Sequence, residues 1–95
     1  MKTNIQYIIN QIQNGTVVKH FKYETLTEEE KKKNKYVYRV LCTNCIDTET
    51  NEELVIYQAL YEPYTTFARP RSLFFSSVDK EKYPYIRQRY RFERF

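Results

Sequence analysis

The stretch from Glu53 to Tyr61 constrains the fold more than any other part of this 95-residue chain. It contains aliphatic, β-branched and aromatic residues in close succession, a composition that favours an extended strand. Alternate side chains of a strand point to opposite faces. One predicted face carries Val55, Tyr57, Ala59 and Tyr61, and the other carries Leu54, Ile56, Gln58 and Leu60. Because both faces are mostly apolar, we expect this strand to lie centrally, with other elements covering each side.

Shorter β-prone runs, separated by polar turns, surround this stretch. They are residues 16–21, 36–42, 65–68, a buried plug or short strand at 72–78, and a C-terminal run that follows Pro84. In this last run Ile86, Gln88, Tyr90 and Phe92 alternate with arginines, which predicts a half-buried terminal strand with a cationic outer face. The run 36–42, the polar turn 44–51 and the long strand predict a hairpin. Together these runs predict a mainly β protein, namely a small five-stranded β-barrel.

Residues 1–14 are expected to form one N-terminal amphipathic helix, strongest over 3–14. Ile5, Ile8, Ile9 and Ile12 recur with helical spacing, and Thr3 with Gln6 has the spacing of a capping box. Gly15 suits the left-handed position that ends many helices. A helix this short is marginal in water, so we expect its Ile face to dock on the barrel formed by 15–95. A groove on a partner protein is the alternative.

Residues 24–35 interrupt the β pattern with a run rich in Glu and Lys. Thr27 and Glu30 have capping-box spacing, and the pairs Glu28–Lys32 and Glu29–Lys33 have i,i+4 spacing. Because almost no apolar residue anchors this segment, we expect an exposed, mobile excursion with one or two helical turns.

The formal charge of +4 is unevenly distributed, with an acidic middle at 36–66 between two basic ends. Such a layout favours either an anionic partner or self-complementary packing. No N-terminal apolar segment resembles a signal peptide, and no stretch approaches the ~20 apolar residues that a membrane span requires. Two cysteines do not make a disulfide scaffold. We therefore expect a cytoplasmic protein without membrane contact, either a monomer or a weak homodimer.

A recognisable series of motifs runs through 15–93: Gly15, His20–Lys22, Tyr38–Leu41, Thr48–Thr50, Glu52–Tyr61, Phe67–Pro70, Phe74–Phe75 and Arg91–Glu93. Their order resembles a bacterial family known as the domain of unknown function numbered 1653. The resemblance implies an SH3-like small barrel and no established activity. The family usually has Trp in place of Phe67 and Gly in place of Tyr23, and often His in place of Asp47. It also lacks the Glu/Lys-rich excursion.

Two features with catalytic or metal-binding potential are weak. Cys42 and Cys45 have CxxC spacing, but one such pair cannot complete a zinc site, and His20 is the only histidine. The pair follows a predicted strand rather than opening a helix, which argues against a redox role. No spacing singles out a catalytic group around His20. The sequence therefore predicts a non-enzymatic protein with no metal and no cofactor.

The predicted binding site is an aromatic and cationic surface. Its members are Tyr57, Tyr61, Phe67, Arg69 and Arg71, with His20 and Lys22 as polar neighbours. No acid lies between Glu62 and Asp79 to neutralise these arginines locally, so they either pair with the acidic hairpin turn or bind a ligand. We expect a docking surface for a protein or peptide partner.

The alternative function is binding of single-stranded nucleic acid along the C-terminal run. Arg87, Arg89 and Arg91 alternate there with aromatic residues, as in small barrels that stack bases and track phosphates. The alternation puts arginines and aromatics on opposite faces, which weakens this alternative. No RNA- or DNA-binding signature accompanies the run.

Overall fold

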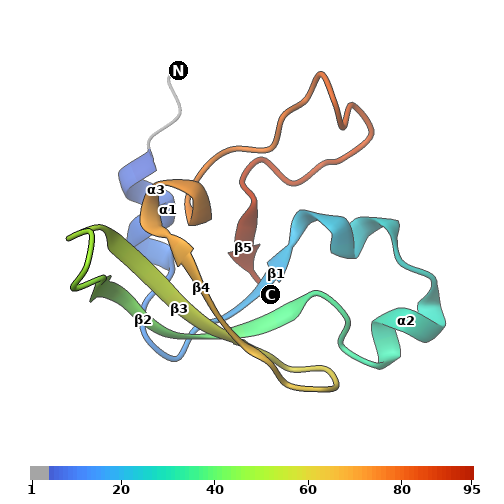
Figure 1. Ribbon diagram of the computed structural model, residues 1–95. Helices are drawn as coiled ribbons and strands as arrows, with labels where there is room; N and C mark the ends of the chain where they lie inside the picture. The colour runs from blue at the N-terminus through green and yellow to red at the C-terminus, as the bar shows by residue number, and fades with distance from the viewer. Residues whose placement is uncertain (1–4) are drawn as a thin grey trace.

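The structure is a computed structural model that describes residues 5–95 (Figure 1). In chain order its elements are α1 (Ile5–Gln11), β1 (Val17–His20), the 3-10 helix η1 (Phe21–Thr25), α2 (Glu28–Lys32), β2 (Val37–Ile46), β3 (Glu53–Ala59), β4 (Thr66–Pro70), α3 (Arg71–Phe74) and β5 (Phe92–Arg94). The five strands form one antiparallel sheet in the order β4-β3-β2-β1-β5. The protein is therefore mainly β, as predicted.

The sheet is open and is not the closed barrel that the sequence predicted. β4 and β5 are its two edges, and neither pairs with the other. The sheet stays open because β4 runs directly into α3 and β5 is only three residues long. The sheet nevertheless curves, as ring contacts between its two ends show. The Phe92 ring of β5 lies 5.3 Å from the Tyr57 ring of β3 and 4.2 Å from the Phe74 ring of α3.

The long strand β3 lies second from an edge, so the prediction of a central strand covered on both sides is wrong. Val55, Tyr57 and Ala59 are buried, whereas the residues on the opposite face are only half-buried. β2 occupies the centre of the sheet instead. It extends to Ile46 and contains both cysteines, whereas the predicted strand ended at Cys42 and left Cys45 in the turn. Two register shifts interrupt its pairing with β3.

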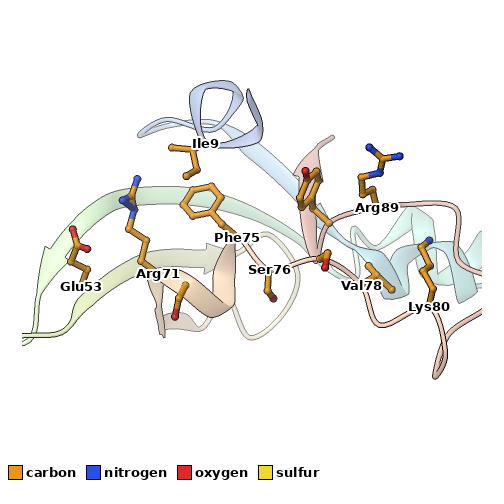
Figure 2. Close-up of a pocket in the computed structure, with 11 residues that line it drawn as sticks. Ile9, Glu53, Arg71, Phe75, Ser76, Val78, Lys80 and Arg89 are labelled. Carbon is orange, nitrogen blue, oxygen red and sulfur yellow. The ribbon is translucent and has the colours of Figure 1, made fainter. Parts of the chain in front are cut away.

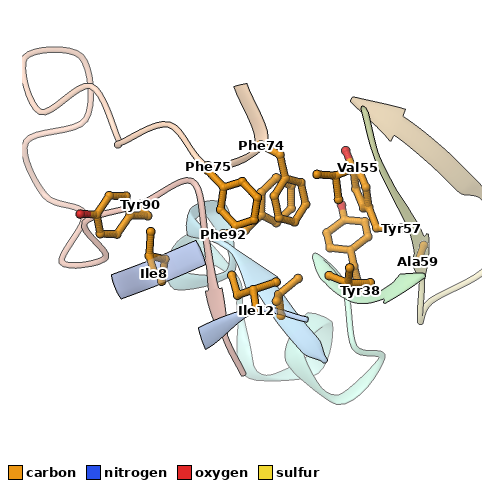
Figure 3. Packing of buried hydrophobic residues seen from close by; sticks show 12 residues of the cluster. Ile8, Ile12, Tyr38, Val55, Tyr57, Ala59, Phe74, Phe75, Tyr90 and Phe92 are labelled. Carbon is orange, nitrogen blue, oxygen red and sulfur yellow. The ribbon is translucent and has the colours of Figure 1, made fainter. Parts of the chain in front are cut away.

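The core lies on the concave side of the sheet (Figure 3). Phe74 and Phe92 stack at its centre, with Tyr38 and Tyr57 beside them. Ile8 and Ile12 of the N-terminal segment, 7% and 2% exposed, belong to this core. The chain leaves the helix through Gly15, whose φ of +93° is a left-handed conformation that favours glycine. The predicted Thr3 cap lies outside the described residues.

The Glu/Lys-rich segment 24–35 contains the helical turn that the sequence predicted, α2. Thr27 and Glu30 form the predicted capping box at the start of α2. The ion pairs differ from the prediction, because Glu28 pairs with Lys31 and Glu29 with Lys32, one residue closer in sequence. α2 has no buried residue and lies far from α1 (Figure 1).

The C-terminal run shows the predicted alternation of burial without forming the predicted strand. Ile86, Gln88, Tyr90 and Phe92 are buried, but only Phe92–Arg94 is a strand. Two backbone hydrogen bonds of 2.8 Å pair the run with 76–78, from the Val78 N–H to the Arg89 carbonyl and from the Arg91 N–H to the Ser76 carbonyl. Side chains bind other backbone groups of the run. The Glu24 carboxylate accepts hydrogen bonds from the backbone N–H groups of Arg87 (2.8 Å) and Gln88 (2.7 Å). The Gln88 amide donates to the carbonyls of Lys19, Tyr90 and Arg91.

Across residues 5–95, no helix has the length and apolar character needed to cross a bilayer.

Candidate functional site

His20 lies at the end of β1, where its backbone pairs with Phe92 of β5. Its imidazole is half-buried among aromatic rings. The ring centroids of Phe21, Phe92 and Tyr36 are 4.3, 5.2 and 5.9 Å away. The fold therefore brings the single histidine into contact with residues more than 70 positions later in the chain.

His20 is neutral at physiological pH, and its tautomer follows from one hydrogen bond. Nδ1 accepts from the backbone N–H of Lys22 at 3.1 Å, so the neutral ring carries its proton on Nε2. Burial, as the largest cause, and the positive charges of Arg91, Lys22 and Arg69 together lower the His20 pKa from 6.5 to about 3. His20 thus offers an uncharged N–H donor among cations.

Arg69 is oriented by Tyr57. The Arg69 Nε donates to the Tyr57 hydroxyl at 3.1 Å. Tyr57 is only 4% exposed, and its ring contacts those of Phe92 at 5.3 Å and Phe67 at 5.6 Å. The sequence placed Tyr57 on the binding surface; in the structure its ring is in the core, and it acts by holding Arg69.

Arg91 reaches the same region from the residue before β5. Its backbone N–H donates to the Ser76 carbonyl at 2.8 Å, and its Nε donates to the Ser76 hydroxyl at 3.2 Å. Its charge is close enough to lower the His20 pKa. The sequence assigned Arg91 to a nucleic-acid surface, whereas the fold places it with His20.

We define the His20 cluster as His20, Lys22, Tyr57, Arg69, Arg91 and Phe92. In the described part of the chain, no carboxylate lies within 4 Å of the charged groups of Lys22, Arg69 or Arg91. The acidic hairpin turn does not supply one. Asp47 accepts instead from the backbone N–H groups of Glu49 (2.8 Å) and Thr50 (3.4 Å) within its own turn. The predicted alternative of a structural pair between Arg69 and this turn is therefore not formed.

Aromatic residues border the His20 cluster. Phe67 is 38% exposed, and its ring lies 6.2 Å from that of Tyr38. The hydroxyls of Tyr38 and Tyr61 are 2.9 Å apart, and Tyr61 is half-buried. Burial and this hydrogen bond raise the pKa of Tyr38 well above its ordinary value, so Tyr38 stays protonated. The border is thus aromatic and uncharged, and it lies beside a cationic centre.

Arg71 does not join this cluster, although only Pro70 separates it from Arg69. It lines a separate pocket of about 850 Å³, where its guanidinium carbon lies 5.4 Å from the Phe75 ring centroid (Figure 2). Ile9 of α1 and Lys80 line the same pocket. Strand alternation would put both arginines on one face, but β4 ends at Pro70 and Arg71 begins α3, so its side chain lies in a different region.

The predicted nucleic-acid surface is divided by the fold. Arg87 and Arg89 are exposed, Arg91 is half-buried, and the intervening Gln88 and Tyr90 are buried in the interior. The rings that would stack on bases therefore fill the core. Tyr85, which is 91% exposed, is an exception that lies in the loop before this run.

Within residues 5–95, no three His, Cys, Asp or Glu side chains are grouped closely enough to hold a metal ion. Cys42 and Cys45 are free and half-buried in β2. Three residues of strand separate their Cα atoms by roughly 10 Å, which exceeds the ~7 Å limit for a disulfide.

Replacing Cys42 and Cys45 together with Ala is expected to change the free energy of unfolding by about 1 kcal/mol or less, because both are half-buried. Val40→Ala in the same strand is the matched control. Val40 is 0% exposed, and its truncation should cost about 1.5–3 kcal/mol. Urea unfolding followed by circular dichroism measures both. Stoichiometric zinc in the purified protein would contradict the expectation.

Two aromatic residues that contact His20 were not assigned to the predicted site. Phe92 was predicted on one face of a half-buried terminal strand, and Tyr36 in the strand 36–42. The available signal was β pairing between the two ends of the chain, which puts Phe92 opposite His20. That pairing spans most of the sequence, so local patterns do not reveal it.

None of the curated proteins or solved structures compared with this chain matches it. A family model described as "Protein of unknown function (DUF1653)" matches residues 16–94, which include every member of the His20 cluster. The chain therefore belongs to the DUF1653 family.

Proposed function

We propose that this protein is a non-enzymatic binding module that docks an extended segment of a protein partner along the free edge of β4, beside the His20 cluster. In this view the curved sheet corresponds to an SH3-like small barrel that is left open between β4 and β5. A reducing compartment, the cytoplasm, suits its two free cysteines.

The observation that carries the proposal is the free backbone edge of β4. The Thr65 carbonyl accepts from the Ala59 N–H at 2.9 Å, so the backbone groups of Thr65, and of every second residue after it, face β3. The N–H and C=O groups of Thr66 and Ala68 then face away from the sheet. β4 is the terminal strand of the sheet, so these groups have no strand partner within residues 5–95. An extended peptide binds such an edge through main-chain hydrogen bonds.

The side chains beside this edge supply specificity. Phe67 and Arg69 lie on one face of β4, toward Tyr57 and the concave side of the sheet. A strand added to β4 would place its alternate side chains on that same face. It would therefore present one side chain to the half-exposed Phe67 ring and another to Arg69.

The test uses a substitution that affects the edge but not the sheet. Ala68→Pro removes an outward N–H that β3 does not use, whereas Ala68→Val keeps it. We expect proline to weaken partner binding at least about tenfold, since one lost hydrogen bond is worth roughly 1 kcal/mol and the ring also obstructs the added strand. Valine should preserve binding.

The measurement is quantitative capture from an extract of the source cells by the intact chain and both variants, followed by titration of the captured protein. Retention on single-stranded DNA, at low and high salt, is measured in parallel. Capture that is unchanged by Ala68→Pro would contradict docking on β4. Salt-sensitive retention on DNA without a captured protein would favour nucleic-acid binding instead.

A further inference from the structure

We infer that the His20 cluster binds an oxyanion, a carboxylate or phosphoryl group, carried by the docked protein segment. This inference rests on the proposed docking function and specifies the chemistry recognised by the same site. Contacts join the groups of the cluster: the Phe92 ring lies 5.2 Å from the His20 ring and 5.3 Å from the Tyr57 ring, and the Tyr57 hydroxyl accepts from Arg69 at 3.1 Å. Arg91 directly precedes Phe92 in the chain.

Each polar group that the cluster offers to a ligand is a hydrogen-bond donor. Guanidinium groups have N–H donors and no acceptor. Arg69 uses its Nε on Tyr57, and Arg91 uses its Nε on Ser76, so the terminal nitrogens of both remain to contact a ligand. Tyr57 is 4% exposed, and its hydroxyl serves to hold Arg69 rather than to contact a ligand. The His20 ring adds a neutral Nε2–H.

The charge of the cluster selects the sign of the ligand. Three cationic side chains influence His20, and no carboxylate of residues 5–95 lies within 4 Å of them. A cationic ligand in the aromatic border would be repelled by Arg69 and Arg91. A neutral ligand would leave their charges uncompensated. An oxyanion instead accepts charge-assisted hydrogen bonds, which are about twice as strong as neutral ones.

The donors are also held in place before a ligand arrives. Tyr57 is fixed by the core, where its ring contacts Phe74 at 5.3 Å and Phe92 at 5.3 Å. Ser76 holds Arg91, and the Lys22 N–H holds the His20 ring. These hydrogen bonds mean that the side chains lose less conformational freedom when a ligand binds. Arg69, Arg91 and His20 are also half-buried, so their interaction with a charge is less screened than at an open surface.

The experiment is a titration of the full isotope-labelled chain with inorganic phosphate, and separately with sodium acetate, at pH 7 and constant ionic strength. Nuclear magnetic resonance follows the Arg69 Nε–H and the His20 ring signals. We expect saturable shifts of both, with dissociation constants on the order of 1 mM, a modest affinity suited to small ions. In Arg69→Gln, the His20 shifts should require at least about tenfold more anion.

Arg87→Gln is the matched control because it removes the same charge from an exposed site outside the cluster. It should titrate like the unmodified chain. Phosphate binding more than tenfold tighter than acetate would support a phosphoryl group, and comparable binding would support a carboxylate. Shifts that do not saturate, or that weaken equally in Arg69→Gln and Arg87→Gln, would overturn the inference.

The two proposals fail separately. If oxyanions titrate as expected but Ala68→Pro leaves partner capture unchanged, the docking mode is wrong and the oxyanion site stands. If Ala68→Pro abolishes capture and the His20 and Arg69 signals do not shift with either anion, the docking mode stands and the oxyanion inference is overturned.

Discussion

Phe92→Ala is expected to lower the free energy of unfolding by about 3–5 kcal/mol, which is the usual cost of deleting a buried Phe side chain. Phe92 is 2% exposed and stacks on Phe74 at 4.2 Å and 7°. Its ring also contacts those of Tyr38, Tyr57 and His20. A domain of this size is stable by only about 5–15 kcal/mol, so one substitution should remove a large fraction of its stability.

Phe95→Ala is the matched control for this expectation. It makes the same change three residues later, where the side chain is 61% exposed and contacts Tyr23 at 5.6 Å. We expect it to cost about 0.5 kcal/mol. Chemical unfolding of both variants, followed by circular dichroism, provides the comparison. Equal losses would show that β5 does not contribute to the core.

Lowering the pH from 7 toward 4 is expected to destabilise the protein through His20. The His20 pKa is about 3 in the folded protein, against an ordinary value of 6.5. Between these values the unfolded chain binds the proton and the folded chain does not, so stability falls as pH falls. One such group contributes at most roughly 1.4 kcal/mol per pH unit. Because His20 is only half-buried, solvent screening reduces the total effect to about 2–3 kcal/mol.

His20→Asn isolates this contribution. Asparagine does not titrate, and its side-chain oxygen can accept the Lys22 N–H in place of Nδ1. The pKa of Glu30 is lowered by its hydrogen bonds to Thr27, so Glu30 also favours the folded state at higher pH, but it does so equally in both proteins. Urea unfolding from pH 7 to pH 4 should therefore show a flatter profile for His20→Asn. Parallel profiles would contradict the placement of His20.

The DUF1653 match spans both arginines of the His20 cluster. The matched region ends at residue 94 and so includes both Arg69 on β4 and Arg91 before β5. Helix α1, Ile5–Gln11, lies entirely before the matched region. A truncation to residues 16–94 would remove Ile8 and Ile12 from the core, so binding measurements require the full chain.

Local sequence patterns determined several features of this protein. The capping box at Thr27 and Glu30 depends on residues three positions apart. The turn at Gly15 depends on a single residue that tolerates a positive φ. The alternation from Ile86 to Phe92 predicted which side chains are buried, even though most of that run is not a strand. Each feature follows from local geometry, which a short window of sequence contains.

Only the tertiary structure determined that the sheet stays open and which residues form the site. Whether β4 meets another strand depends on how far β5 extends and where α3 turns, both of which involve contacts between distant segments. Arg69 and Arg71 are neighbours in sequence but lie in different regions, whereas Arg91 joins His20 across 71 positions through the pairing of β5 with β1. Such placements depend on strand register and on the packing of Phe92 and Phe74 in a shared core, and no local propensity encodes them.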